Sequence, residues 1–413
     1  LRYFKRIFNQ GIDFIYEAKL TLVGDGNAGK TSLQTRLLDQ DARLPAKDER
    51  TRGIQISDWN FGVVNGKEQI AHIWDFGGQD VYYPVHRFFL TENSVYVLLA
   101  STRQNNHNFE YWIPTIYQFG GKSPIILGQT CDRGNRASWT EVSYFVSNTN
   151  FNIIKTKEDP YYELNLPEGN RGLSELKEVI INQITCLPHY GKGVPQSWVA
   201  VRDKLFSLAQ IKACIPFFDF VQLCKTIDPK SFINNVDVHD CASFLHSIGV
   251  ILWYSANEEL RAWVILQPEW AMNAVYQIID DEEILKRKGN ILAKDFERLW
   301  REEQFEGMHP IIKKMLEVFK IAFPKKHKKN EYILPARLAA MPRSSKWSSE
   351  SPYLRLEYHY DFMPKGIVNQ LSAELSRYII SDEDVWNNAI NLRSDISNAE
   401  CQVEEDFYQR KVT

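Results

Sequence analysis

The sequence predicts an α/β fold, a mixed six-stranded sheet flanked by helices, with a separate α+β module behind it. Three observations predict the sheet. A glycine-rich motif at 24–31 follows a buried strand and precedes a helix with apolar residues at helical spacing. Two alternating strands then flank an Asn-Gly pair at 65–66, which is a strong hairpin signal. Beyond that hairpin, strand and helix patterns alternate to about residue 185.

The glycine-rich motif predicts a phosphate site. Residues 24–31, GDGNAGKT, fit G-x-x-x-x-G-K-[ST] at every fixed position, so backbone N–H groups and the following helix N-terminus can wrap a polyphosphate. Lys30 is expected to neutralise the β- and γ-phosphates and the Thr31 hydroxyl to complete a Mg²⁺ shell. A glycine-rich turn is the alternative. The nucleotide-binding residues expected here are Gly24, Asp25, Gly26, Asn27, Ala28, Gly29, Lys30, Thr31 and Ser32.

A hairpin directly after a phosphate-loop helix is the element order of the small GTPases. Its second strand leads into Asp75-Phe76-Gly77-Gly78-Gln79, which is D-x-x-G followed by Gln. Asp75 is expected to hold Mg²⁺ through water and the Gly78 N–H to touch the γ-phosphate. Gln79 is expected to orient the attacking water. An ordinary turn that contains Asp and Gly is the alternative.

Three further residues are candidates for the hydrolytic machinery. Thr51 precedes the first hairpin strand, where its hydroxyl would reach Mg²⁺ only when the γ-phosphate is present. A turn threonine is the alternative. Arg52 and Arg87 are candidates for the arginine that stabilises the transition state of GTP hydrolysis, and a surface salt bridge is the alternative for each.

Base recognition is expected at the end of the strand over 124–128. GTPases read guanine there with [N/T]-K-x-D, because one carboxylate accepts both donors on the guanine edge and adenine offers no such pair. Asp132 fits this role, but Gln129 and Thr130 replace the usual Asn and Lys. The match is partial, and it favours guanine over adenine. The loop that shields the base is expected near 164–165, without an assigned residue.

Composition narrows the class of protein. The 413 residues have a formal net charge of −3, which gives no sign of a nucleic-acid or membrane-binding surface. The six cysteines form no C-x-x-C pair and indicate reduced thiols of a cytoplasmic protein. No apolar run is long enough to cross a bilayer. Because the chain opens on Leu1, we expect a piece of a longer protein.

A second domain is expected after the Pro- and Gly-rich segment at 186–195. Helical patterns, then two short strands joined by a polar turn, predict a winged-helix-like packing. The helices are expected at 198–208, 216–223 and 242–248, and the strands at 250–254 and 262–266.

These motifs resemble those of a known family. GDGNAGKTSL, TRGI and DFGGQDVYYPVHRFFL resemble the Roc (Ras of complex proteins) GTPase domain. VPQSWVAVRDKL, SFLHSIGVIL, VILQPEWAMNAVY, YILPARL and YDFMPKGI resemble the COR domain, in the same order. Roc followed by COR is the arrangement of Roco proteins, and the resemblance covers the chain from about residue 19 to the 370s. The Gly78-Gln79 pair favours a prokaryotic origin.

The resemblance implies a Ras-like P-loop GTPase followed by an α+β COR module with a winged-helix-like part. It implies homodimerisation through COR, coupled to nucleotide state, within a larger signalling protein. Leucine-rich repeats usually precede Roc, and some members carry a kinase domain after COR. The expected division is 1–17 as the edge of an upstream domain, 18–187 as Roc, 188–195 as linker, 196–335 as N-terminal COR and 336–413 as an incomplete, dimerising C-terminal COR.

The expected function is therefore hydrolysis of GTP to GDP and phosphate. Two alternatives stay open. One is a scaffold that binds the nucleotide with little or no hydrolysis. The other is an ATP-driven oligomerising switch of the STAND type, which shares the phosphate loop but requires adjacent acidic residues at a strand end instead of D-x-x-G.

Overall fold

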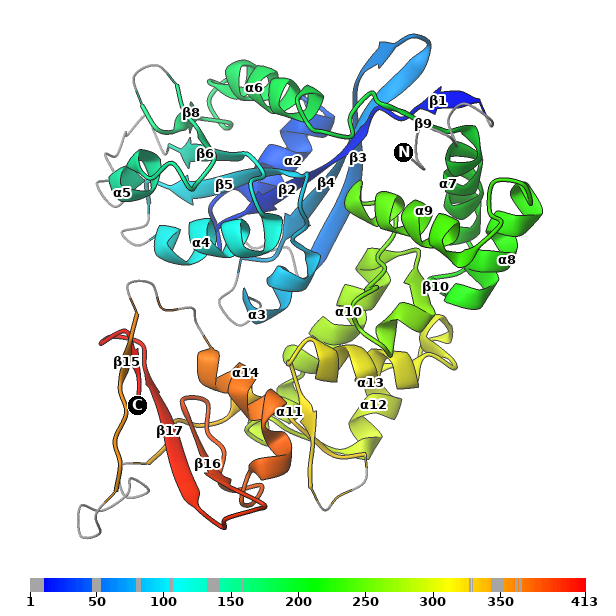
Figure 1. Cartoon of the computed structure of the whole chain (residues 1–413). Helices are drawn as coiled ribbons and strands as arrows, with labels where there is room; N and C mark the ends of the chain where they lie inside the picture. Colours follow the sequence, from blue (N-terminus) through cyan, green and yellow to red (C-terminus); the bar gives the residue numbers. More distant parts are fainter. Residues whose placement is uncertain are drawn as a thin grey trace. The chain divides into compact units, whose positions relative to one another are not determined.

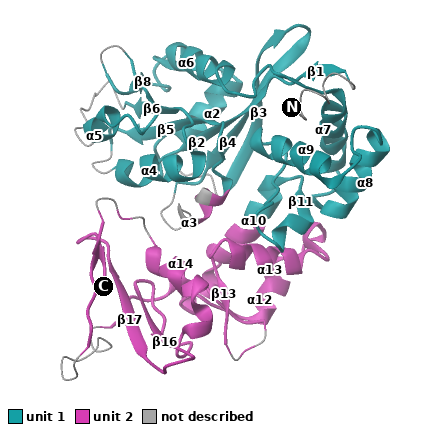
Figure 2. Cartoon of the chain, in the orientation of Figure 1, with its two compact units in different colours: residues 1–80, 89–272 teal, residues 81–88, 273–413 magenta. Residues whose placement is uncertain are grey.

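The computed structural model describes most of the chain as two compact units (Figure 2). The first consists of residues 1–80 and 89–272, the second of residues 81–88 and 273–413. The described residues are 11–46, 53–78, 83–103, 107–131, 142–156, 159–326, 328, 330–342, 353–360, 363 and 366–413, without the side chains of 83, 84 and 87.

The first unit is built on a seven-stranded mixed sheet in the order β3-β4-β2-β5-β6-β7, with β8 also paired to β6. Only β3 runs antiparallel to its neighbour. The predicted six strands match the width of the sheet. The seventh arises because two short strands pair with β6 one after the other. β7 pairs with the beginning of β6, and β8 pairs with its end. The strands are β2 (Glu17–Val23), β3 (Ile54–Val64), β4 (Lys67–Phe76), β5 (Val95–Ser101), β6 (Ile125–Thr130), β7 (Ile153–Ile154) and β8 (Tyr162–Leu164).

The sequence explains the strand positions. All residues of β2 and β5 are buried, as expected for central parallel strands covered on both faces. In the edge strand β3 only Ile54 and Trp59 are buried, and its other residues are partly or fully exposed. It joins β4 through Asn65 and Gly66, whose φ angles of 52° and 78° suit the two-residue turn that the Asn-Gly pair predicts.

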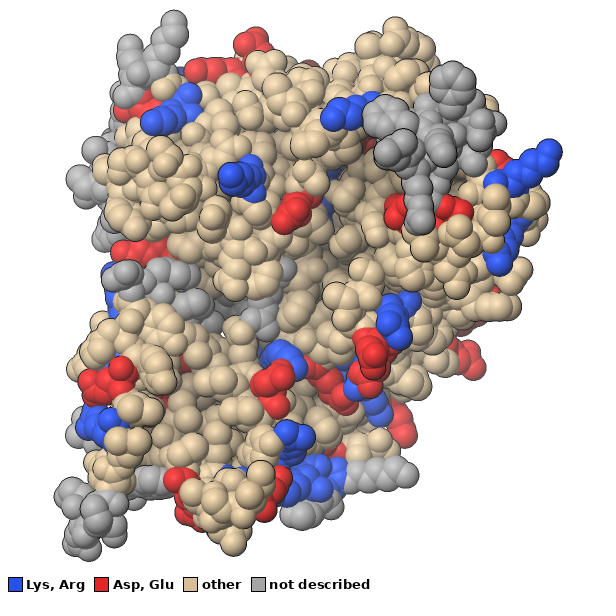
Figure 3. Space-filling view, viewed as in Figure 1, with Lys and Arg blue, Asp and Glu red and all other residues tan. Residues whose placement is uncertain are grey.

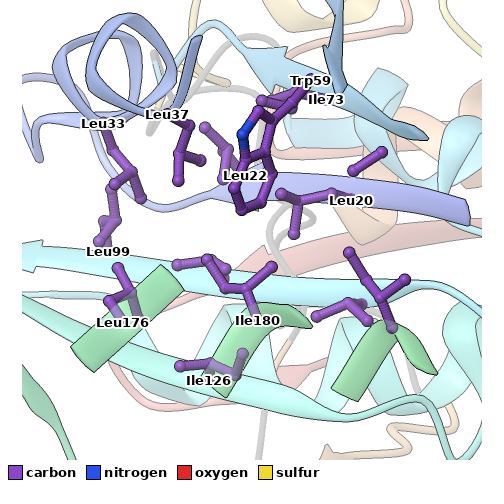
Figure 4. Close-up of a cluster of buried hydrophobic side chains, with 14 of the residues drawn as sticks. Leu20, Leu22, Leu33, Leu37, Trp59, Ile73, Leu99, Ile126, Leu176 and Ile180 are labelled. Carbon is purple, nitrogen blue, oxygen red and sulfur yellow. The ribbon is translucent and has the colours of Figure 1, made fainter. Parts of the chain in front are cut away.

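Helices cover both faces of this sheet (Figure 1). α2 (Lys30–Leu38) and α6 (Leu173–Thr185) lie on one face, and α4 (Phe109–Gly120) lies on the other. A short helix, α5 (Val142–Ser147), precedes β7. Figure 4 shows the core under α2 and α6. Its labelled side chains are Leu20, Leu22, Leu33, Leu37, Trp59, Ile73, Leu99, Ile126, Leu176 and Ile180.

The two segments that flank the seven-stranded sheet in the sequence pair with each other. β1 (Ile12–Phe14) runs antiparallel to β9 (Gly193–Pro195). Ile12 and Ile15 are spaced as in a helix, but Ile12 lies in a strand. A β-carbon on Gly193 would lie 2.5 Å from Ile12 Cγ2, so the glycine permits the close approach.

The following part of the first unit has the winged-helix order of elements. The order is α7 (Gln196–Ala209), β10 (Cys214–Pro216), α8 (Phe217–Ile227), α9 (Asn235–Ser247), a short extended segment and β11 (Trp263–Ile265). β11 pairs mainly with β10. The extended segment contributes Leu252, which exchanges two backbone hydrogen bonds with Ile265 at 2.9 and 3.0 Å. The predicted strand over 250–254 is thus reduced to a single bridge.

The second unit contains the C-terminal helices and two small sheets. α10 (Pro268–Ile279) begins in the first unit and ends in the second. One sheet has the order β12-β14-β13, the other β15-β18-β17-β16. The helices are α3 (Tyr83–His86), α11 (Glu282–Lys286), α12 (Ala293–Leu299), α13 (His309–Val318) and α14 (Ile367–Glu374), and the strands are β12 (Asn290–Ile291), β13 (Phe323–Pro324), β14 (Tyr332–Ile333), β15 (Tyr358–His359), β16 (Ala389–Arg393), β17 (Glu400–Asp406) and β18 (Lys411–Val412).

All six cysteines are free thiols. Within the described ranges no helix has both the length and the apolarity needed to cross a membrane. On the face drawn in Figure 3, Lys and Arg are interspersed with Asp and Glu.

Candidate nucleotide-binding site

The phosphate loop connects the carboxyl end of β2 to the first turn of α2. Lys30 is the first residue of α2, and its ammonium donates hydrogen bonds to the carbonyl oxygens of Gly24 (2.8 Å) and Asp25 (2.9 Å). Gly29 precedes it with φ 91°, a left-handed conformation that favours glycine. The lysine side chain is thus folded back over the loop, where two loop carbonyl oxygens hold its ammonium.

Burial and nearby carboxylates set the protonation of this lysine. Burial lowers the pKa of Lys30, while the negative charges of Asp75 and Asp25 act in the opposite direction. Phosphate groups next to the ammonium would act in the same direction as these carboxylates. The loop therefore offers a desolvated cation that an anionic ligand would stabilise.

Two glycines are required by close backbone contacts. A β-carbon on Gly24 would lie 2.1 Å from the Leu99 carbonyl oxygen on β5. A β-carbon on Gly78 would lie 2.5 Å from the carbonyl carbon of Asp25 and from the Gly26 nitrogen. The glycine of the D-x-x-G motif therefore lies directly against the phosphate loop, as its predicted contact with a γ-phosphate requires.

The two described candidates for metal ligation lie side by side. The Thr31 hydroxyl at the start of α2 donates to the Asp75 carboxylate on β4 at 2.6 Å. A hydroxyl and a carboxylate are oxygen donors of the kind that Mg²⁺ prefers when phosphates complete its shell. Among the described residues no group of three or more His, Cys, Asp and Glu side chains could hold a metal. The donor set fits Mg²⁺ bound together with a phosphate ligand.

The end of β6 supports the loop from the other side. The Thr130 hydroxyl donates to the Ala28 carbonyl at 3.0 Å, and a β-carbon on Gly29 would lie 3.0 Å from the Thr130 methyl carbon. The neighbouring Gln129 is fully buried, and the Cys131 thiol donates to its side-chain oxygen at 3.7 Å. Thr130 therefore contacts the phosphate loop, a role that its place in the base-reading motif does not predict.

Two contacts to the loop were missed by motif analysis. Asn108 Nδ2 donates to one carboxylate oxygen of Asp25 at 2.9 Å, and Trp112 Nε1 donates to the other at 3.3 Å. Asn108 immediately precedes α4 and Trp112 lies in its first turn. In the sequence, Trp112 reads as one of many core residues of an apolar helix. The one sequence signal for these contacts is Asp25, because an acidic side chain that is buried in a phosphate loop needs hydrogen-bond donors.

Several predicted site residues lie outside the described part of the chain. These are Thr51, Arg52, Gln79 and Asp132, together with the side chain of Arg87, whose backbone lies in the 3₁₀ turn Arg87–Phe89. Asn27 occupies the middle of the phosphate loop with φ 63°, and Ser32 follows Thr31 in α2. The described residues thus bring together the loop, Lys30, Thr31, Asp75, Gly78 and Thr130.

Comparison with known proteins identifies the family. Residues 19–132 match the model described as "Ras of Complex, Roc, domain of DAPkinase". Residues 195–338 match "C-terminal of Roc, COR-A domain", and residues 351–413 match "C-terminal of Roc, COR-B domain". The chain belongs to the Roco family. The predicted fold class, a Ras-like GTPase domain followed by COR, is confirmed.

Several Roco relatives align along almost the whole chain. "Probable serine/threonine-protein kinase pats1" of Dictyostelium discoideum is 24% identical over 94% of this chain and 13% of its own length. A "Roc-COR-CHAT protease" of Runella zeae is 25% identical over 97% of this chain and 44% of its own. The chain thus spans less than half the length of these curated relatives. Among solved structures, Methanosarcina barkeri Roco2 RocCORdC bound to GDP has TM-score 0.66 at 24% identity, over 80% of this chain and 98% of that one.

Proposed function

We propose that the Roc domain binds GTP with Mg²⁺ and hydrolyses it to GDP and phosphate. The observation that carries this proposal is the arrangement around the phosphate loop. The Lys30 ammonium is folded over the loop, the Thr31 hydroxyl contacts the Asp75 carboxylate, and Gly78 lies against the Asp25 backbone. A cation, a pair of oxygen donors for Mg²⁺ and the D-x-x-G segment at 75–78, which we call the second switch, therefore lie around the loop that would bind the terminal phosphates.

Each residue has a distinct part in this proposal. The loop N–H groups and Lys30 bind and orient the phosphates, and the Gly78 N–H contacts the γ-phosphate. Gln79 orients the water for in-line attack. Thr31, Thr51 and Asp75 would hold Mg²⁺, which supplies positive charge to the transferring phosphoryl group when bound. Arg52 and Arg87 are the candidates for the transition-state arginine, which is worth roughly 10³–10⁵ in rate in GTPases that have one.

Guanine is the proposed base because the Asp132 carboxylate can accept both edge donors of guanine. A solved Roco structure with GDP bound supports this choice. Gln129 in place of the usual Asn is the departure that weakens it. Competition of GTP and ATP for one binding site tests the base, and it also tests the STAND-type alternative, which requires ATP.

We further propose that nucleotide state is coupled to homodimerisation through COR. The COR-A and COR-B matches support this, together with relatives in which Roc and COR form only part of a longer polypeptide. The larger protein would be a cytoplasmic signalling protein, with leucine-rich repeats before Roc and, as in the relatives named as kinases, a kinase domain elsewhere in the chain.

Two substitutions test hydrolysis against binding. Lys30→Ala should abolish nucleotide binding, because the loop loses its only assigned cation. Gln79→Leu should keep binding and lose turnover. Lys204→Ala, on the exposed side of α7, is a matched control that should resemble the wild type. Equal turnover in Gln79→Leu and wild type would remove Gln79 from the mechanism.

A scaffold that binds nucleotide with little hydrolysis is the second candidate. The departure at Gln129 favours it, because this residue is buried beside the predicted base-reading position and differs from the residue that GTPases use. GTP bound in the presence of Mg²⁺ without phosphate release would support the scaffold over the enzyme.

A further inference from the structure

The phosphate loop contains a carboxylate, which is unexpected in a site for polyanions. Asp25 is the second residue of the loop, and only 8% of its surface is exposed. A negative charge here repels phosphate unless it is directed away and satisfied by donors. Its two oxygens accept hydrogen bonds from Asn108 Nδ2 (2.9 Å) and Trp112 Nε1 (3.3 Å). Both donors are neutral and belong to α4 and the residue before it.

Both donors are held firmly by α4. Trp112 is fully buried, and its ring packs against Tyr111 with centroids 5.2 Å apart. Asn108 precedes the helix in a left-handed conformation, with φ 47°, and its carbonyl accepts from the N–H groups of Tyr111 and Trp112. Its side chain makes no capping bond within the helix and instead reaches Asp25. Donors fixed in this way can hold the phosphate loop at one position.

The backbone of Asp25 is the place where the other parts of the site meet. Its carbonyl oxygen accepts from Lys30 Nζ at 2.9 Å and from the Ala28 N–H at 3.3 Å. A β-carbon on Gly78 would lie 2.5 Å from its carbonyl carbon. A shift of Asp25 therefore moves an acceptor of the phosphate-binding lysine and the surface on which the second-switch glycine lies.

We infer that Asn108 and Trp112 are positioning residues, which hold the phosphate loop through the Asp25 carboxylate and thereby set how long a guanine nucleotide stays bound. The inference rests on the proposed function, since it concerns nucleotide at the same loop. It gives α4 a role in holding the phosphate loop, which the G-x-x-x-x-G-K-[ST] motif does not predict. The carboxylate also acts on Lys30, whose pKa it raises against the effect of burial.

The test is the rate at which a fluorescent GDP analogue leaves the whole chain when excess GDP is added. Asn108→Ala and Trp112→Phe each remove one donor to a carboxylate, and hydrogen bonds to charged groups are strong enough that we expect release to accelerate about tenfold. Asn152→Ala and Trp300→Phe are matched controls, because each removes the same kind of donor from a bond that does not involve the phosphate loop. Asn152 Nδ2 donates to the Lys122 carbonyl, and Trp300 Nε1 donates to the Ala274 carbonyl. Both controls should release GDP at the wild-type rate.

A double-mutant cycle separates positioning from general loosening. In an Asp25→Ala background, Asn108→Ala should add no further acceleration, because its acceptor is already absent. Thermal unfolding of the nucleotide-free variants should remain a single cooperative transition above the assay temperature, although the loss of a hydrogen bond to a buried carboxylate lowers its midpoint. Equal acceleration by Asn108→Ala in both backgrounds would overturn the inference, as would release rates within twofold of wild type for both donors.

The controls also distinguish this inference from the proposed function. If the wild type binds the GDP analogue and Lys30→Ala does not, the site is confirmed, and the release rates of the α4 variants decide the inference alone. If the wild type binds no guanine nucleotide, the proposed function fails and the inference fails with it.

Discussion

The ring of Phe88 stacks on the ring of Phe319, with centroids 4.3 Å apart and an interplanar angle of 24°. Both residues belong to the second unit, although Phe88 follows the D-x-x-G switch closely in sequence. The next residue, Phe89, belongs to the first unit, where its ring lies 6.3 Å from Trp74 and 6.4 Å from Phe76. The assignment of the chain thus changes from the second unit to the first between Phe88 and Phe89, shortly after the D-x-x-G motif.

This stacking predicts a variant that binds nucleotide normally but loses the proposed effect of the nucleotide on oligomeric state. Phe88→Ala removes an aromatic pair worth about 0.5–1.5 kcal/mol beyond its buried area. We expect GDP affinity to stay within about threefold of wild type, while the difference in oligomeric state between GDP and a GTP analogue is lost. Light scattering measures that difference. Phe218→Ala, at an exposed site on α8, is the matched control. A wild-type response in Phe88→Ala would exclude this contact from the coupling.

The contact of Thr31 with Asp75 predicts the magnesium dependence of nucleotide release. Asp75→Asn keeps the size of the side chain and removes the charge that would hold Mg²⁺. EDTA should accelerate GDP release strongly in the wild type and only weakly in Asp75→Asn, because the variant has already lost most of the metal. The same response to EDTA in both proteins would show that Asp75 does not bind Mg²⁺.

A buried lysine predicts stability that rises with pH. Lys19 on β2 is fully buried, donates to the Phe89 carbonyl at 2.5 Å and lies 3.7 Å from the Trp74 ring centroid. Burial lowers the pKa of Lys19 from 10.5 to about 7. Between these values the unfolded chain holds the proton and the folded chain does not, so the lysine increases stability as pH rises. Relative to Lys19→Met, the wild type should gain roughly 2 kcal/mol between pH 7 and 9 in urea unfolding. Parallel pH profiles would contradict this.

A histidine nearby on the sheet predicts the opposite slope. Burial disfavours charge on His72, but hydrogen bonds to Asp58 (2.6 Å) and Glu17 (3.3 Å) outweigh it and raise the pKa of His72 from 6.5 to about 9. The folded chain then holds a proton that the unfolded chain releases, so this stabilisation is complete below pH 6.5 and is lost as pH rises through 9.

The expected loss for the histidine between pH 7 and 9 is again roughly 2 kcal/mol. Wild type should therefore be nearly flat in this range, because the two groups offset each other. His72→Gln should become more stable with pH, and Lys19→Met less stable. If His72→Gln follows the wild-type profile, the imidazole is not charged in the folded protein.

Much of the fold follows from local sequence patterns. The buried run of β2, the glycine-rich loop and the Asn-Gly turn each carry their own geometry, so the GTPase sheet could be predicted strand by strand. The positions of Lys30, Thr31 and Asp75 followed from the same motifs. Their proximity depends only on parallel strands ending at one edge of the sheet.

Other features depend on contacts between distant segments, which no local pattern shows. Ile12 has helical spacing but pairs with Pro195, because a strand partner 183 residues away overrides the local signal. The winged-helix sheet pairs β11 with β10 across two helices, where the sequence suggested the nearer segment at 250–254. Asn108 and Trp112 were missed for the same reason, since their acceptor lies more than 80 residues before them.

The most direct test of the account is a single-turnover measurement of phosphate release from GTP, with Mg²⁺ and the purified chain in excess. We expect the wild type to bind GTP and release phosphate, and Gln79→Leu to bind GTP equally well without releasing it. Bound GTP that the wild type leaves intact would contradict hydrolysis, and GTP that does not bind at all would contradict the site.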